Sequence, residues 1–132
     1  MLMTTSDMAI AHSMKLPARA LVVEDNMVVA LDMAEILEDA GVSDIRVAAT
    51  VEQGLSFLDE SPVDFALLDV NLGTSTSLEV AKVLASRGVP FILTTGYEGA
   101  SGMTDGFPPS PILVKPYSPS DIVAAVADLF GL

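Results

Sequence analysis

Five short apolar runs, separated by longer amphipathic segments, constrain the fold more than any other feature of this chain. Each run has three to five residues and is mostly apolar on both faces, which is typical of parallel strands covered on two sides. The runs are Ala20–Val23, Ile45–Ala49, Phe65–Leu68, Phe91–Leu93 and Ile112–Val114. Strands that alternate with helices favour right-handed crossovers, so the pattern predicts an α/β fold with a doubly wound parallel sheet.

The segments between the runs carry signals for the ends of helices. In residues 27–40 the acidic side chains form one stripe and the apolar side chains another, and Gly41 follows as a stop. Capping pairs are predicted at Thr50 with Gln53 for a helix near 51–60, at Thr76 with Glu79 for 77–87, and at Ser118 with Asp121 for the last helix. These signals predict helices after the first, second, third and fifth strands.

Residues 96–111 differ from the other connections. The segment has four glycines and three prolines in sixteen residues, a composition that allows at most a short, weak fourth helix. We therefore expect this segment to be the most mobile part of the fold.

The length of 132 residues favours one domain. Residues 1–17 show no sustained hydrophobic period and end at a proline, so we expect a mobile N-terminal extension followed by a folded domain over 18–132. We expect no second folded unit in these residues. We therefore expect the domain to act by contact with another protein.

Charge and cysteine content narrow the functional classes. Eighteen acidic and six basic residues give a net charge of −12, which disfavours binding to nucleic acid or to an anionic membrane surface. Without cysteine there is no disulfide framework, thiolate nucleophile or cysteine-based metal site. The chain starts without a secretory pattern and has no run near the ~18 apolar residues of a membrane span, so we expect a cytoplasmic protein.

Polar residues follow four of the predicted strands. They are Glu24 and Asp25 after the first, Asp69 and Asn71 after the third, Thr94 and Thr95 after the fourth, and Lys115-Pro116 after the fifth. In doubly wound sheets the functional crevice lies at the carboxyl ends of the strands. If the first and third strands are neighbours, ~4.8 Å apart, three carboxylates meet in one partly desolvated pocket. Their repulsion would be relieved by Mg²⁺, a hard ion that prefers oxygen ligands, and by the ammonium of Lys115.

Such a group of side chains suits phosphoryl transfer to a carboxylate. Asp69 would attack phosphorus, Lys115 and the cation would neutralise charge on the phosphoryl oxygens, and Thr95 would donate a hydrogen bond to one of them. Thr94 competes for the role of Thr95, but the glycine after Thr95 favours the latter. A Lys-Pro bond at a strand end is also a plausible cis peptide.

The ordered set Glu24-Asp25, Asp69, Thr95 and Lys115-Pro116 resembles the receiver domain of two-component response regulators, and the resemblance spans residues 18–131. It implies a flavodoxin-like sheet of order 2-1-3-4-5 and a transient phosphate on Asp69, supplied by a histidine kinase or a histidine phosphotransfer protein. It also implies Mg²⁺ on the side chains of Asp25 and Asp69 and the backbone carbonyl of Asn71, with Glu24 assisting through water.

The chain departs from the common receiver pattern in three places. Many receivers have a Tyr or Phe three residues before the lysine, where this chain has Ile112, and Tyr97 or Tyr117 are the candidates to replace it. Leu72-Gly73-Thr74-Ser75 stands where a Pro-Gly turn is common. The fourth strand is similar to that of stand-alone bacterial receivers with Phe-Ala-Thr-Gly, with Leu93-Thr94 in place of Phe-Ala.

Two other functions fit parts of the pattern. A small phosphatase of the haloacid dehalogenase type also places an aspartate nucleophile at a strand end, but it needs a second aspartate two residues later, where this chain has Asn71. A receiver-like module that binds a partner without phosphorylation is the other alternative, and failure to bind Mg²⁺ would favour it.

Overall fold

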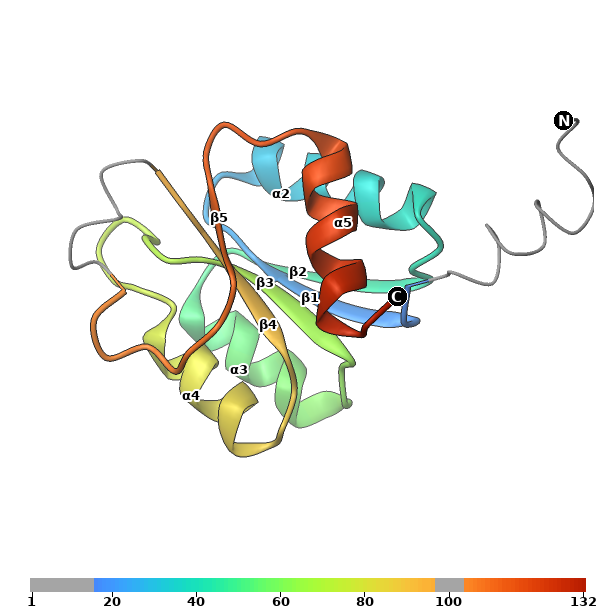
Figure 1. Ribbon diagram of the computed structural model, residues 1–132. Coiled ribbons are helices and arrows are strands. Elements are labelled where there is room, and N and C mark those ends of the chain that lie inside the picture. Colours follow the sequence, from blue (N-terminus) through green and yellow to red (C-terminus); the bar gives the residue numbers. More distant parts are fainter. Residues whose placement is uncertain (1–15, 97–103) are drawn as a thin grey trace, which may run out of the picture.

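The five strands form one parallel sheet of order β2-β1-β3-β4-β5 in the computed structural model, which describes residues 16–96 and 104–132 (Figure 1). This order and the α/β class confirm the expected fold. The strands are β1 (Arg19–Val23), β2 (Asp44–Ala48), β3 (Phe65–Asp69), β4 (Phe91–Thr95) and β5 (Ile112–Val114). Each starts or ends within two residues of its predicted apolar run, because the runs are where both faces of the sheet are covered.

Two helical layers enclose the sheet. α2 (Met27–Asp39) and α5 (Pro119–Leu129) cover one face, and α3 (Val51–Glu60) and α4 (Leu78–Ser86) cover the other (Figure 1). Each layer packs its own apolar cluster against the sheet. The central strands β1, β3 and β4 are buried almost throughout, while the edge strands β2 and β5 are partly exposed.

Two of the three predicted helix caps are present. The Thr50 hydroxyl accepts a hydrogen bond from the backbone N–H of Gln53 at 3.1 Å, and the Gln53 side chain reaches back to the N–H of Ala49. At α5 the capping box of Ser118 and Asp121 is complete, with both reciprocal hydrogen bonds formed. These contacts start both helices at the predicted residues.

The capping pair predicted at Thr76 and Glu79 is not formed, and the Thr76 hydroxyl accepts the N–H of Leu78 at 3.4 Å instead. The residue before α4 is Ser77, which enters the helix with φ −83° and ψ 14° and makes no side-chain cap. An N-cap side chain reaches the first free N–H groups from an extended backbone, which Ser77 does not have. Its backbone N–H is directed to the carbonyl of Val70 at 3.1 Å, so the preceding loop determines how the chain enters the helix.

Parts of two predicted segments lie outside the described residues. Of the segment 96–111, residues 104–111 form turns and bends without a helix, and residues 97–103 are not described. Of the predicted extension, residues 1–15 are not described, and Leu16 is buried against the layer of α2 and α5. Within the described residues no helix is long and apolar enough to cross a membrane.

Candidate functional site

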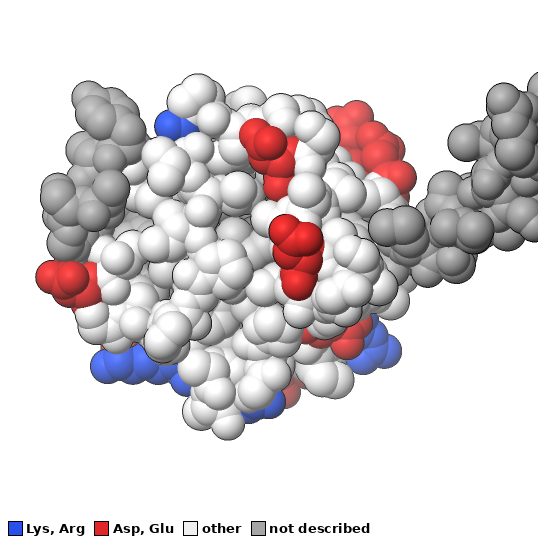
Figure 2. Space-filling view, viewed as in Figure 1, with Lys and Arg blue, Asp and Glu red and all other residues white. Residues whose placement is uncertain are grey.

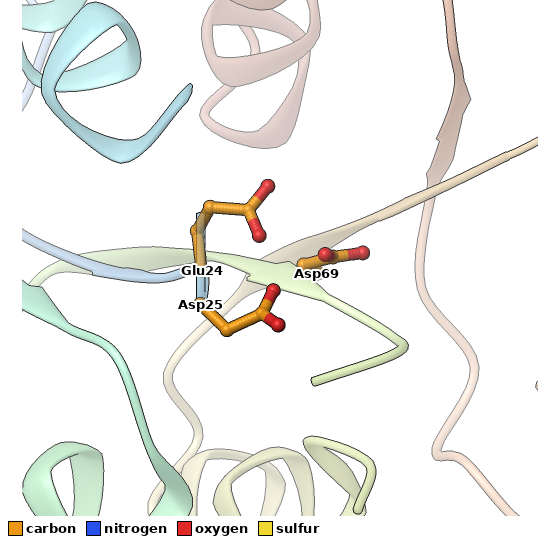
Figure 3. Close-up of side chains that lie close together, drawn as sticks. All are labelled: Glu24, Asp25 and Asp69. Atoms are coloured by element: carbon orange, nitrogen blue, oxygen red, sulfur yellow. The ribbon is translucent and has the colours of Figure 1, made fainter. Parts of the chain in front are cut away.

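Three carboxylates meet at the carboxyl ends of β1 and β3 (Figure 3). The two strands pair in parallel, with Val23 opposite Leu68, so the residues that follow, Glu24 and Asp69, lie side by side. One oxygen from each of Glu24, Asp25 and Asp69 lies within 4.8 Å of the others. Glu24 and Asp69 are buried, with 1% and 7% of their surface exposed, whereas Asp25 is exposed. The structure thus brings the three predicted carboxylates together.

Lys115 supplies the positive charge at this cluster. Its Nζ lies 3.6 Å from Oε1 of Glu24 and 3.7 Å from Oδ2 of Asp69. The lysine follows β5, and its backbone N–H donates to the carbonyl of Thr95 at 2.8 Å, which ties it to the end of β4. Its peptide bond to Pro116 is cis, as predicted. One ammonium therefore faces two buried carboxylates.

Glu24, the more deeply buried of the two buried acids, holds a proton near neutral pH. The pKa of Glu24 is raised from 4.5 to about 8, chiefly because burial removes water from the charged form, and further by the hydrogen bond and the negative charge of Asp69. The backbone N–H of Asn26, which donates to Oε2 of Glu24 at 3.3 Å, opposes this shift. Lys115 alone thus does not balance the cluster, and a divalent cation would displace the proton.

The donor atoms around the cluster suit a small hard cation. Carboxylate oxygens are the ligands that Mg²⁺ prefers in proteins. The side chain of Asn71 accepts the N–H of Gly73 at 2.9 Å, so its amide oxygen is engaged in the turn. Asn71 and Thr76 face each other in an isolated antiparallel bridge, whose two hydrogen bonds join the residues on either side of this pair. The backbone carbonyl of Asn71 therefore takes no part in these hydrogen bonds. The backbone carbonyl, which the resemblance to receivers implies as a ligand, is therefore the group of Asn71 that suits this role.

Gly73, in the loop after β3, lies beside Asp25. Its φ is +86°, a conformation that favours glycine, and an added Cβ would lie 3.5 Å from Oδ2 of Asp25. A glycine here keeps the space beside that carboxylate open. The unusual loop sequence therefore still meets the steric needs of the acidic cluster.

Two threonines end β4, and they lie on opposite faces of the sheet. Thr95 is 3% exposed, and its hydroxyl donates to the carbonyl of Gly96 at 3.1 Å. Thr94 is fully buried, pairs with Asp69 in the register of β3 and β4, and has a hydroxyl without a hydrogen-bond partner. In the sequence, the glycine after Thr95 favours Thr95, whereas the strand register shows that Thr94 adjoins the aspartate.

The candidates for the aromatic position differ in their surroundings. Ile112 is 46% exposed on the edge strand β5. Tyr117 is half-buried against the apolar cluster under α2 and α5, and Tyr97 lies outside the described residues. Burial, and next the charge of Glu24, raise the pKa of Tyr117 to about 12. The phenol of Tyr117 therefore lies near the acidic cluster and is protonated at neutral pH.

Comparisons with known proteins agree with this geometry. The chain is similar to the transcriptional regulatory protein PdtaR of Mycobacterium tuberculosis, with 24% identity over 113 residues, 83% of this chain and 55% of that protein. It thus spans about half the length of that curated relative. Among solved structures, it is 32% identical to SdrG from Sphingomonas melonis, with a TM-score of 0.74 and coverage of 86% of this chain and 97% of that one.

Another solved neighbour shares the fold at lower identity. The receiver domain of the PhyR response regulator of Erythrobacter litoralis is 20% identical, with a TM-score of 0.77 over 91% of this chain and 94% of that one. The model of the response regulator receiver domain matches residues 20–127. That range includes all five strands but the first residue of β1, and every residue of the acidic cluster. The chain therefore belongs to the response regulator receiver domain family.

Proposed function

We propose that this receiver domain accepts a phosphoryl group on Asp69 from a histidine kinase or a histidine phosphotransfer protein. It then signals by contact with another protein or passes the phosphate on. The observation that carries the proposal is the position of Asp69, which is buried 3.7 Å from the ammonium of Lys115 and adjoins two further carboxylates. A carboxylate so placed is a nucleophile with a fixed partner for the charge that develops during transfer.

In the proposed step an oxygen of Asp69 attacks the phosphorus of a phosphohistidine. A P–O bond forms and the P–N bond breaks, and the imidazole leaves with the electron pair and takes up a proton. Lys115 faces the phosphoryl oxygens, and Thr95 turns its hydroxyl from the Gly96 carbonyl toward one of them. These residues orient and neutralise the group that is transferred.

The carboxylates of Asp25 and Asp69 and the carbonyl of Asn71 would hold Mg²⁺, with Glu24 assisting through water. A bound Mg²⁺ supplies positive charge to the phosphoryl oxygens. The cluster has the donor chemistry for this ion, since three carboxylate oxygens lie within 4.8 Å of one another. The protein's part is to keep those oxygens close in the absence of phosphate.

The donor protein has an apolar surface to contact beside the site. Three side chains at the start of α2 are exposed although apolar, namely Met27 at 45%, Val28 at 80% and Leu31 at 60%. α2 begins two residues after Asp25, and a donor must approach this edge of the sheet to reach Asp69. This apolar surface is therefore the contact that we propose for the phosphohistidine-bearing donor.

The output surface is proposed at the other side of the crevice. Ile112 and Val114 are 46% and 43% exposed on β5, next to residues 104–111. The face over β5 and α5 is largely uncharged, with isolated acidic side chains (Figure 2). An uncharged, partly apolar face suits a protein partner, and Lys115 and Thr95 join it to Asp69.

One experiment tests whether Asp69 is the residue that accepts the phosphoryl group. The full chain is incubated with Mg²⁺ and acetyl phosphate, and intact mass is measured for the wild type, for Asp69→Asn and for Asp59→Asn, an exposed acid on α3 that serves as the matched control. We expect one added phosphoryl group in the wild type and in Asp59→Asn, and none in Asp69→Asn or with EDTA. Label that persists in Asp69→Asn would refute the assignment, and an unlabelled wild type would favour the unphosphorylated interaction module.

A further inference from the structure

A groove of about 470 Å³ lies between α2 and α5, away from the acidic cluster. Its apolar walls are formed by Ile36 and Ala40 of α2 and by Pro119 and Val123 of α5. The side chains of Ile36, Ala40 and Val123 pack against the cluster beneath the two helices but are only partly buried. The groove therefore leaves apolar surface open to a further contact.

Three carboxylates line the same groove. They belong to Asp32, Glu35 and Asp39, and all three come from α2. Within the described residues none of the three takes part in an ion pair. Neither α2 nor α5 contains a lysine or an arginine that could neutralise them. The groove therefore suits an occupant that combines apolar side chains with a positive charge.

The chain enters this helical layer beside one end of the groove. Leu16 is 5% exposed and belongs to the apolar cluster beneath α2 and α5. Two residues later, the carbonyl of Ala18 accepts the N–H groups of Ser43 and Asp44 at 3.1 and 2.9 Å. These contacts hold the start of the described chain next to the carboxyl end of α2, where Asp39 lines the groove. Residues that precede Leu16 therefore begin close to the groove.

Residues 1–15 lie outside the described residues, and their sequence has the composition that the groove suits. Six of the fifteen are methionine, leucine or isoleucine, and Lys15 directly precedes Leu16. Methionine side chains adapt to irregular apolar surfaces. The groove extends along α2 from Asp32 to Ala40, which is about 12 Å at the helical rise per residue. Fifteen residues reach up to about 50 Å when extended, so the segment is long enough to lie along the groove.

We propose that residues 1–15 dock in the groove between α2 and α5 of their own chain. The ammonium of Lys15 then faces the carboxylate of Asp39, at the end of the groove beside Leu16. Ile10 and the methionines contact the apolar walls. A protein that binds this groove must displace the segment first, so the segment limits access to the outer side of α2. The inference does not depend on the phosphorylation of Asp69.

The test uses the absence of cysteine from the chain, which allows a nitroxide label at a single introduced cysteine. Ser6→Cys is labelled in the full-length chain, and paramagnetic broadening of the backbone amides is measured by NMR. We expect broadening at Ile36, Ala40 and Val123 in the groove, and none at Val83 in α4, on the other face of the sheet. A mixture of spin-labelled chains and ¹⁵N-labelled chains without the nitroxide detects docking on a second copy, and groove broadening in that mixture would overturn the proposal.

Ile10→Asp tests the apolar contact, and Thr4→Asp is the matched control because it adds the same charge without removing an apolar side chain. Neither variant changes a residue of the described fold. Ile10→Asp should lower the ratio of docked to free segment by about tenfold or more, the effect of losing one buried apolar side chain. Asp39→Asn should lower it by about two- to fivefold, as expected for an exposed ion pair.

These changes in the docked fraction are measured as weaker broadening at the groove amides. Thr4→Asp should keep the broadening of the labelled chain without a further substitution. Broadening that is unchanged in Ile10→Asp, that falls equally in Thr4→Asp, or that is absent from the groove in every variant would overturn the proposal.

Discussion

The two halves of the crevice are built differently. At the ends of β1 and β3 the acidic cluster is set on strands that are almost wholly buried, and two of its three carboxylates are shielded from water. At the ends of β4 and β5 the site has hydroxyls, and β5 is a strand of three residues with two exposed apolar side chains. The buried charges lie on closely packed strands, whereas in the other half β4 is buried and only the edge strand β5 has little packing to restrain it.

Lys115 is what joins the two halves. It follows the loosely packed strand, yet its ammonium contacts both buried acids of the rigid half at 3.6 and 3.7 Å. A change of charge at Asp69 therefore acts on the residue that follows β5, a short and partly exposed strand. The contrast between the halves is thus a physical basis for a switch.

Truncating one apolar side chain in each half tests whether the two halves differ in packing. Leu67→Ala, in fully buried β3, should lower the free energy of unfolding by about 2–5 kcal/mol. Ile112→Ala, at the exposed edge, should lower it by less than about 1 kcal/mol, since little area and no closed cavity are involved. Urea unfolding of the metal-free chain measures both, and equal losses would show that β5 is packed as firmly as β3.

The acidic half predicts an unusual pH dependence. The pKa of Glu24 is about 8 in the folded chain and 4.5 as its ordinary value, so between these values the folded state holds a proton that the unfolded state has lost. Metal-free stability should therefore fall as pH rises from about 5 to 8, by up to about 1.4 kcal/mol per pH unit. Mg²⁺ should raise the melting temperature more at pH 8 than at pH 6, because fewer protons compete with it.

Glu24→Gln is the control for this dependence. The amide oxygen can still accept the N–H of Asn26, but the titrating group is gone. Thermal unfolding of the metal-free variant across the same pH range should give a flatter profile than that of the wild type. The same slope in both proteins would assign the pH dependence to groups outside the acidic cluster.

The smallest expected difference is in the free energy of unfolding when the serine before α5 or the serine before α4 is replaced by alanine. Ser118→Ala removes a complete capping box after β5 and should cost about 1 kcal/mol. Ser77→Ala, after β3, removes a buried hydroxyl that makes no cap and has no partner, so it should be close to neutral. Chemical denaturation of both variants measures the difference, and a larger loss for Ser77→Ala would mean that its hydroxyl is bonded in solution.

The sequence predicted most of the rigid half. Apolar runs indicate burial on both faces, and the carboxyl ends of parallel strands lie at one edge of the sheet, so the sequence predicts that Glu24 and Asp69 meet if β1 and β3 are neighbours. The sheet order came from the resemblance to receivers, because alternating strands and helices do not by themselves specify which strands are neighbours.

The sequence is less informative where the strand register or the backbone angles determine which side chains interact. Thr94 was ranked below Thr95, since its pairing with Asp69 depends on the alignment of β3 and β4. The predicted pair of Thr76 and Glu79 does not form, because α4 begins after Ser77, whose backbone is not extended. The sequence also does not predict the exposure of β5, because an apolar run at the edge of a sheet has the same pattern as a run at its centre.

The shortness of β5 has a consequence for the behaviour of the protein in concentrated solution. An exposed edge strand with apolar side chains is a template on which another chain can pair and aggregate. Here Pro111 precedes the strand and Pro116 follows the lysine after it, and neither has an N–H to donate. With three residues between them in strand conformation and a net charge of −12 on the chain, self-association through this edge is disfavoured while its side chains stay open to a specific partner.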